Sequence, residues 1–419
     1  MLDAIHSQIQ TIDGVVSSPY ADVILQSAFQ PIISLAHHRT VGYEALIRGS
    51  RPAGESVFPP DIFSLAKTEL DTVYLDRLCR ALHVSSFQGA GNESGWLFLN
   101  VNPDVVVHGI KYGTFFKELL TALNMPPERV VIEILESALL DERQLDAAVA
   151  FYRDLGCLIA IDDFGAGHSN FQRIWRLKPH IVKLDRSIIC NAANDAIARR
   201  MLPSIVGTLH EAGSLVLVEG VETEQEAMIA METSADLVQG YYFGRPASVL
   251  SAIDGASDVV SALFSQYRES MELARGRIKY PEHVVAIKQA VVCLNSVADT
   301  RSESLDCLKA LLALPGAESC YVLDENGIQV GETYAIDHNG QQASNLFKPL
   351  ERSQGAVWIR RPYWQRAMSQ QGEIQCTRPY LSVATGRLCV TLSVAYQSPL
   401  GVRLLCFDLD CDVLESKLK

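Results

Sequence analysis

The sequence predicts an α/β fold in which a (β/α)8 barrel of the TIM type, with one antiparallel strand, precedes a smaller α+β domain. Three observations lead to this prediction. Short runs rich in Val, Ile and Leu alternate with longer segments of helical periodicity between residues 25 and 245. This alternation recurs about eight times over ~220 residues, which favours a closed barrel over an open doubly wound sheet. Beyond Pro281 the apolar runs are separated by short turns instead, a pattern typical of antiparallel hairpins.

The barrel strands are expected at the apolar runs, and the helices at the segments of helical periodicity. The expected strands are 28–34, 41–47, 96–101, 130–135, 158–162, 181–184, 215–218 and 235–238. The expected helices are 61–82, 144–155, 195–212 and 224–231. Only residues 37–40 form the turn between the first two strands, and because a crossover helix does not fit there, this pair should be antiparallel.

A long helix is expected to connect the two domains. Val259, Leu263, Tyr267 and Met271 recur at one-turn intervals, with charged residues on the other face. Pro281 then marks the domain boundary. The expected organisation is an N-terminal segment 1–24, a barrel 25–253, a linker helix 254–281 and a C-terminal domain 282–419.

The C-terminal domain should be a compact antiparallel sheet with flanking helices. Its expected helices are 283–297 and 304–314. Its expected strands are 319–323, 328–331, 374–380, 388–396 and 402–409, with a turn at 324–327.

Composition limits both the partners and the compartment. The net charge of -13 argues against a long nucleic acid as partner, because such binding depends on basic side chains that neutralise phosphates. The same charge permits a small anionic ligand if metal ions invert the local field. The 10 cysteines form no CxxC pair, and the chain shows neither a signal-peptide pattern nor a run of about 18 apolar residues. These features predict a reduced, cytoplasmic protein without a membrane span.

Acids, amides and one lysine stand at or near the ends of the predicted barrel strands. They are Glu44, Asn100, Glu133, Glu136, Asp162, Asp163, Lys183, Glu219 and Gln239. Any one of them is most simply explained as a solvated strand end or a helix cap. In a barrel, however, the carboxyl ends of all strands meet at one mouth. So many acids gathered there would repel one another unless cations lie between them.

Carboxylate and amide oxygens without Cys or His favour Mg²⁺ or Mn²⁺ over zinc or copper. Two such ions about 3.5–4 Å apart, bridged by an aspartate, catalyse in-line attack of water on a phosphodiester. The adjacent pair Asp162 and Asp163 suits the bridging role, and Lys183 is placed to orient or deprotonate the attacking water. The residues therefore predict metal-assisted phosphoester hydrolysis, with no organic cofactor.

These residues also resemble, motif by motif, the EAL domain family of cyclic di-GMP phosphodiesterases. The resemblance covers residues 29–246. Its motifs are Gln30-Pro31-Ile32, Glu44-Ala45-Leu46-Ile47-Arg48, Phe98-Leu99-Asn100, Glu133-x-x-Glu136-Ser137, Asp162-Asp163-Phe164-Gly165-Ala166-Gly167, Lys183-x-Asp185-Arg186-Ser187, Glu219-Gly220-Val221-Glu222-Thr223 and Gln239-Gly240-Tyr241-Tyr242-Phe243. The tripeptide alone carries no information, whereas eight ordered motifs at strand ends are specific.

The resemblance implies a role for each matched residue. Two metal ions would be held, one by Glu44, Asn100, Glu133 and Asp162, the other by Asp162, Asp163 and Glu219. Lys183 would contact the attacking water, and Glu222 would orient water or a metal ligand. Substrate contacts would come from Arg48, Gln30 and Gln239, and Glu136 would hold the loop 164–170. The implied reaction is hydrolysis of cyclic di-GMP to linear pGpG, in a protein that is a homodimer.

The chain departs from the family pattern at three positions. Leu135 stands where Thr is usual, Asn102 where Ser is common, and Ala166 where Thr is frequent. None of these replaces a metal ligand, although an apolar side chain at position 135 or 166 makes no hydrogen bond, which would loosen the loop by ~1 kcal/mol. His168, beside that loop, is best explained as a partly exposed loop residue.

Two alternatives to an active phosphodiesterase remain open from the sequence. The first is a catalytically weak cyclic di-GMP receptor or scaffold that signals through the linker helix. The second is a metal-dependent barrel enzyme acting on a carbon acid, which would leave the motifs around Gln30, Arg48 and Gln239 unexplained.

The C-terminal domain resembles, more weakly, a PAS or Cache sensor module. The resemblance rests on the two-helix entry, the turn at 324–327 and the segments 361–367 and 378–382. Tyr363, Trp364, Asp408 and either Arg361 or Arg378 are candidates to line a ligand pocket, with aromatic core packing as the simpler explanation. The domain is therefore expected to sense an unknown small molecule or protein, or to dimerise, and so to regulate the barrel.

Overall fold

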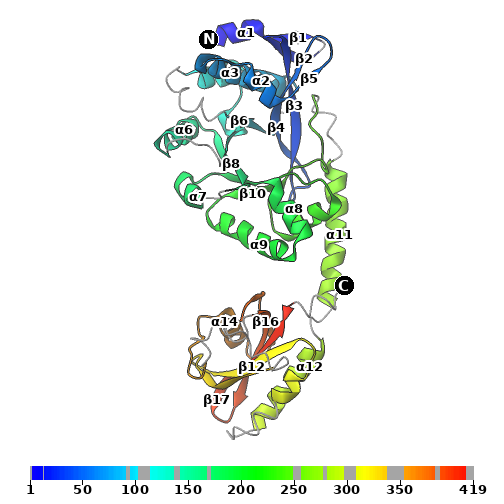
Figure 1. The fold of residues 1–419 in the computed structure, drawn as a ribbon, viewed down its shortest axis with the longest axis vertical. Coiled ribbons are helices and arrows are strands. Elements are labelled where there is room, and N and C mark those ends of the chain that lie inside the picture. The colour runs from blue at the N-terminus through cyan, green and yellow to red at the C-terminus, as the bar shows by residue number, and fades with distance from the viewer. Residues whose placement is uncertain are drawn as a thin grey trace. The chain divides into compact units, whose positions relative to one another are not determined.

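The computed structural model describes residues 2–12, 14–90, 95–101, 114–135, 142–167, 171–248, 256–276, 281–296, 308–336, 353–382 and 387–411. The chain divides into two compact units, Met1–Glu272 and Leu273–Lys419 (Figure 1). In the described part of the chain, no helix has both the length and the apolar character needed to cross a bilayer.

The first unit is built on a closed barrel of eight strands. They are β3 (Val23–Ser34), β4 (Arg39–Ser50), β6 (Trp96–Asn100), β7 (Val130–Leu135), β8 (Leu158–Phe164), β9 (Ile181–Leu184), β10 (Leu215–Val218) and β11 (Leu237–Val238). Their order is β3-β11-β10-β9-β8-β7-β6-β4, and pairing of β3 with β4 closes the ring. β3 is antiparallel to both of its barrel neighbours, and the other neighbouring barrel pairs are parallel. The predicted barrel and its antiparallel strand are confirmed.

Apolar side chains fill the barrel and cover its outer wall. The inner cluster consists of Ile32, Phe98, Val131, Ala160, Ile181, Leu217 and Leu237. A larger cluster packs the opposite faces of the strands against the surrounding helices. Because the parallel strands are buried on both faces, their sequences are almost continuously apolar.

The helices follow the strands around the outside of the barrel (Figure 1). They are α2 (Pro59–Ser64), α3 (Glu69–Gly89), α5 (Phe115–Ala122), α6 (Glu142–Asp154), α7 (Phe171–Leu177), α8 (Arg186–Asn194), α9 (Ala196–Glu211) and α10 (Glu224–Glu232). The single helix expected over 61–82 is two helices, because α2 ends at Ser64 and Thr68 begins α3 with a capping box to Asp71. α5, α7 and α8 were not predicted from the sequence.

The first 20 residues also form elements that were not predicted. They are α1 (Leu2–Gln8), β1 (Gln10–Ile12) and β2 (Val15–Tyr20). β1 and β2 are antiparallel, and β2 extends the sheet by pairing with the start of β3. β5 (Ser56–Val57) similarly pairs with the end of β4.

The long helix after the barrel, α11 (Ala256–Gly276), packs on the first unit. Val260 and Leu263 belong to the large barrel cluster. Phe264 stacks on His38, with ring centroids 4.1 Å apart. The start of this helix is therefore held against the turn between β3 and β4.

A buried ion pair in α3 gives the barrel a specific stability test. Arg80 pairs with Asp76 one turn away, donates to the Tyr152 hydroxyl at 3.0 Å, and lies over the Phe116 ring. Asp76→Ala would leave the Arg80 charge buried without its carboxylate, so we expect the free energy of unfolding to fall by about 3–5 kcal/mol. Urea denaturation followed by circular dichroism measures this change.

The matched control for this test is Asp154→Ala, which removes an exposed carboxylate near the end of α6. We expect this control to change the free energy of unfolding by less than about 0.5 kcal/mol. Equal effects of the two substitutions would show that the buried pair adds nothing to stability.

The second unit is an antiparallel sheet with helices on both faces, and the described residues 308–312 of the helix expected over 304–314 are helical. Its elements are α12 (Pro281–Ser296), β12 (Ala317–Asp324), β13 (Gln329–Ala335), α14 (Pro362–Ser369), β14 (Gln375–Cys376), β15 (Tyr380–Leu381), β16 (Leu388–Ser398) and β17 (Gly401–Asp410). The sheet order is β13-β12-β17-β16-β14, and β15 also pairs with β16. Ile287, Ala290 and Leu294 of α12 pack on one face, and Tyr363 and Ala367 of α14 on the other. The smaller sheet domain is confirmed, and the strand expected over 374–380 is two short strands.

The cysteines differ from the expectation of a fully reduced chain at one position. Eight described cysteines are free thiols. Cys293, on α12, is disulfide-bonded.

Candidate active site

Lys183 is the centre of a cluster of acids at the carboxyl end of the barrel. It lies on β9 and is 1% exposed. Its ammonium lies 2.5 Å from Glu133, 2.6 Å from Glu219, 3.0 Å from Asp162 and 3.7 Å from Glu44. Four of the acids predicted from strand ends are thus brought within ion-pair distance of one cation.

Strand register explains why these side chains meet. β4, β7, β8 and β9 carry one member each, and Glu219 directly follows β10. These strands belong to one consecutive run of the ring, β10-β9-β8-β7-β6-β4. Asn100 is in register with Glu133, and Leu135 with Asp162. Because successive side chains of a strand alternate between its two faces, residues at matching positions of neighbouring strands face the same interior.

Asp163 lies beside Asp162 in sequence, so a regular strand would direct it to the opposite face. Its φ of 58° places it in the left-handed region instead, and its amide donates to Asp162 Oδ1 at 3.0 Å. The β8–β9 pairing is irregular at this point. The carboxylates of Asp162, Asp163 and Glu219 consequently offer oxygens within 4.8 Å of one another.

Two glycines of the motifs allow the loops to approach this cluster. Gly220 has a φ of 65°, and a Cβ there would lie 2.4 Å from Cγ of Arg186. A Cβ on Gly240 would lie 2.0 Å from the carbonyl oxygen of Val221. Larger residues would force apart the loops after β10 and β11, which carry Glu219 and Gln239.

The electrostatics of the cluster favour additional cations. Burial raises the pKa of Glu133 well above its usual range and that of Glu219 to about 8, and neighbouring acids act in the same direction. Burial and the Asp162 charge also raise the pKa of Asp163. Burial alone would lower the pKa of Lys183, but the surrounding carboxylates raise it well above its usual range. The single positive charge of Lys183 is therefore surrounded by several carboxylates, which leaves the cluster short of positive charge.

An unpartnered oxygen points to the same conclusion. Glu133 Oε1 meets Lys183 in an ion pair, whereas Oε2 is buried with no hydrogen-bond donor from the described chain. A buried carboxylate oxygen without a donor is costly unless a cation or water reaches it. With oxygen ligands alone, the cluster fits a hard divalent ion such as Mg²⁺ or Mn²⁺.

Three amide side chains adjoin the acids through Glu44. Asn100 donates to Glu44 Oε1 at 2.9 Å, and Gln239 donates to Glu44 Oε2 at 2.7 Å. Gln239 also donates to the side-chain oxygen of Gln30 at 3.2 Å, and Gln30 donates to the Gly244 carbonyl at 3.3 Å. The side-chain oxygen of Gln239 is buried without a partner in the described chain. Acids and amides thus form one continuous site.

The comparison with protein families agrees with this geometry. The family model described as "EAL domain" matches residues 24–246, which is more than half of the chain. The chain belongs to the EAL domain family. The match spans the barrel strands and the whole of the acid and amide site.

Curated relatives match the same part of the chain. The EAL domain is 30% identical over 227 residues to the probable cyclic di-GMP phosphodiesterase PdeN of Escherichia coli (strain K12), covering 52% of this chain and 43% of PdeN. It is 28% identical over 228 residues to the cyclic di-GMP phosphodiesterase RocR of Pseudomonas aeruginosa, covering 53% of this chain and 57% of RocR. The matched part thus spans about half the length of each of these relatives.

A solved structure matches both units. The YkuI protein of Bacillus subtilis, with an EAL domain and in complex with cyclic di-GMP and calcium, has a TM-score of 0.77 and 22% sequence identity. The match covers 92% of this chain and 96% of that one. The likeness shows that the fold of the EAL domain and the sheet of the second unit also occur in that protein.

Arg48 and Glu222 make their described contacts away from the acid cluster, and three other residues named from the sequence lie outside the described residues. Arg48 is half-buried on β4 and donates to its neighbouring carbonyl, that of Ile47, at 2.9 Å. Glu222 pairs with Arg186 at 2.7 Å. Glu136, Asn102 and His168 fall outside the described residues.

Arg186 is a contact that the sequence did not assign. The motif Lys183-x-Asp185-Arg186-Ser187 contains it, but nothing in the sequence shows that it reaches Glu222 from the next loop. The one sequence feature that indicates the position of Arg186 is Asp185. Its side chain caps α8 by accepting from the Ser187 amide at 3.0 Å, and this fixes Arg186 as the first residue of the helix.

Proposed function

We propose that this chain is a metal-dependent cyclic di-GMP phosphodiesterase that produces linear pGpG. The observation that carries the proposal is the cluster of Glu44, Glu133, Asp162 and Glu219 around Lys183, continued by the amides of Gln30 and Gln239. The names of the EAL relatives supply the substrate class. In the reaction, the oxygen of water bonds to one phosphorus, one P–O bond to a ribose oxygen breaks, and that oxygen takes up a proton, which opens the ring.

The acids divide between two metal positions in this proposal. Glu44, Asn100, Glu133 and Asp162 would hold one Mg²⁺ or Mn²⁺ ion, and Asp162, Asp163 and Glu219 the second. When bound, the ions supply Lewis-acid stabilisation of the phosphodiester oxygens and lower the pKa of bound water.

The remaining residues bind and orient. Lys183 contacts and orients the attacking water, a role that its contacts with the metal-ligand acids support, because these acids keep its ammonium charged. Gln30 and Gln239 position the dinucleotide, and Arg48 binds a phosphate. Glu222 acts as a positioning residue, because it holds Arg186 against Gly220, next to Glu219. Glu136 is proposed to hold the loop 164–170.

The test is turnover of cyclic di-GMP by the purified full chain with Mg²⁺ or Mn²⁺. Products are separated by chromatography, with a chelator and the Glu44→Ala variant alongside. Metal-dependent appearance of pGpG is expected, and Glu44→Ala should lose at least about 10³-fold in rate, because it removes a metal ligand and the acceptor of two amide contacts. Glu211→Ala, an exposed acid at the end of α9, is the matched control and should retain the full rate.

Two other outcomes would contradict the proposal in different ways. Tight binding of intact cyclic di-GMP with both metals would identify a receptor, and would direct attention to Leu135 and Ala166. Neither turnover nor binding would show that the family membership does not extend to this substrate.

We also propose that the second unit is a PAS- or Cache-like domain that regulates the barrel, in a homodimer. Its antiparallel sheet with helices on both faces supports the domain type. Light scattering of the full chain, with turnover measured over a range of protein concentrations, tests the dimer. A monomer at all concentrations would exclude it.

A further inference from the structure

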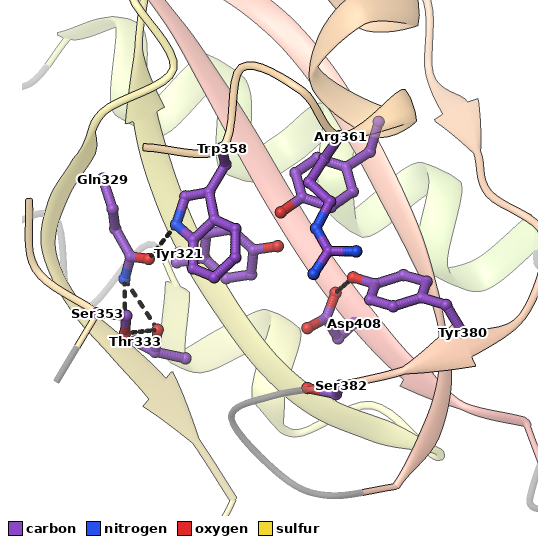
Figure 2. Close-up of a pocket in the computed structure, with 10 residues that line it drawn as sticks. Tyr321, Gln329, Thr333, Ser353, Trp358, Arg361, Tyr380, Ser382 and Asp408 are labelled. Atoms are coloured by element: carbon purple, nitrogen blue, oxygen red, sulfur yellow. Dashed lines mark hydrogen bonds between the residues drawn. The ribbon is translucent and has the colours of Figure 1, made fainter. Parts of the chain in front are cut away.

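The second unit contains a cavity that the proposed hydrolysis does not use. Its volume is about 40 Å³, and a single water needs roughly 10–15 Å³ of comparable volume, so the space suits a few waters or a small molecule. The lining residues are Tyr321, Gln329, Thr333, Ser353, Trp358, Arg361, Tyr363, Tyr380, Ser382 and Asp408 (Figure 2). Most are aromatic or polar, and only Arg361 and Asp408 are charged.

One polar side of the cavity is saturated by its own hydrogen bonds. Gln329 donates to Thr333 at 2.8 Å and to Ser353 at 3.3 Å, and its oxygen accepts from the Trp358 indole at 3.0 Å (Figure 2). The hydroxyls of Thr333 and Ser353 are also bonded to each other, at 2.9 Å. This side fixes the position of the Trp358 ring and leaves little hydrogen-bonding capacity for a ligand.

The opposite side carries a buried anion. Asp408 lies on β17 and is 2% exposed. Its carboxylate accepts from Thr391 at 2.7 Å, from Ser319 at 2.9 Å and, at 3.5 Å, from the Tyr380 hydroxyl. Burial raises the pKa of Asp408 to about 6 against the effect of these bonds, so the group remains mainly ionised at neutral pH. Neutral hydroxyls solvate the charge but do not compensate it.

Arg361 faces this anion without touching it. Figure 2 shows its guanidinium directed toward Asp408, between the rings of Trp358 and Tyr380. The guanidinium lies 5.8 Å from the Trp358 centroid and 5.9 Å from that of Tyr380. No carboxylate of the described chain lies within ion-pair distance of it, and its side chain makes no hydrogen bond to a described residue. A cation and an anion thus face each other across the cavity, each without a charged partner among the described residues.

We propose that this cavity binds a small zwitterion of the α-amino acid class. The ligand carboxylate pairs with the Arg361 guanidinium, which offers a planar fork of donors. The ligand ammonium lies toward Asp408, beside the electron-rich faces of Tyr321 and Tyr363, which also attract cations. The cavity volume limits the ligand to a small side chain. A monoacid or a simple amine would pair with one of the two charges and leave the other without a charged partner.

The proposal is tested by ligand binding to the full chain, which requires no turnover. The probes are the twenty L-α-amino acids, screened by thermal shift, and the best of them is titrated by calorimetry. Its N-acetyl and carboxamide derivatives are titrated in parallel, because each lacks one charge. We expect at least one small amino acid to bind, and each derivative to bind about ten- to hundredfold more weakly.

Variants locate the site. Arg361→Gln should weaken binding about ten- to hundredfold, whereas Arg360→Gln, which changes the exposed neighbour outside the cavity, should leave it unchanged. Asp408→Asn should weaken binding similarly, and Arg361→Gln keeps the test valid if that buried variant fails to fold. The proposal is overturned if no amino acid binds, if either derivative binds as well as its parent, or if Arg361→Gln binds as tightly as the unaltered chain. Binding is measured without cyclic di-GMP turnover, so failure of this proposal and failure of the proposed hydrolysis are distinguishable.

Discussion

Lys183→Met should lower the rate of cyclic di-GMP hydrolysis by about 10²–10⁴-fold, because the variant loses the charged group that contacts and orients the attacking water. The substitution replaces the ammonium with an apolar side chain of similar length at a fully buried position. It removes the group that contacts Glu133, Glu219 and Asp162 together. Single-turnover rates measured by chromatography at saturating Mn²⁺ would report the loss without interference from product release.

The variant should also change the stability of the protein, because Lys183 balances the charge of the surrounding acids as well as contacting the attacking water. Without metal, the carboxylates around Lys183 would lose their shared cation, so the melting temperature should fall. Added divalent ions should raise the melting temperature of the variant by more than they raise that of the unaltered chain. Lys117→Met, on the exposed face of α5, is the control and should change neither quantity. A rate within tenfold of the original would contradict the assignment of Lys183 to the chemical step.

Asp162→Asn is expected to abolish the response of the protein to divalent ions as well as its turnover. Asp162 offers an oxygen to the cluster with Asp163 and Glu219 and contacts Lys183, so it is placed to serve both metal positions. Ions at a hundredfold excess over their dissociation constant stabilise a folded protein by about 2.7 kcal/mol. We expect the unaltered chain to show a rise in melting temperature with Mg²⁺ or Mn²⁺, and the variant to show little or none.

Thermal unfolding with and without metal, followed by the turnover assay, measures both effects. Asp154→Asn, the same change on an exposed turn of α6, should behave like the unaltered chain. If Asp162→Asn kept both its thermal response and its turnover, the metal positions would have to be assigned to other residues.

The barrel was predictable because a strand that is buried on both faces has an almost continuously apolar sequence. The expected bounds 130–135, 181–184 and 215–218 coincide with β7, β9 and β10. The hairpin of β1 and β2 was not predictable in this way. β2 lies next to the edge of the sheet and contains Pro19. Proline is tolerated at such a position, but in a sequence it more often indicates a turn than a strand.

The site was predictable as a set of residues but not as a network. Strand position alone places acids at one mouth, which is why the four partners of Lys183 were anticipated. The bond from Gln239 to Glu44 joins residues 195 positions apart and exists only because the ring closes between β11, β3 and β4. The pair of Glu222 with Arg186 joins the loop after β10 to the first residue of α8, and no periodicity in the sequence encodes it.

The antiparallel pairing of β3 with β4 connects the turn between these strands to two residues of the site. β3 and β4 form a continuous two-stranded ribbon whose turn is held by the stacking of His38 on Phe264 of α11. Gln30 and Glu44 lie opposite each other on this ribbon, roughly 15 Å from the turn by the rise of a strand. A displacement of the turn would therefore move Gln30, the proposed nucleotide contact, and Glu44, the proposed metal ligand, together. Control exerted through α11 would then alter substrate affinity and catalytic rate in the same step.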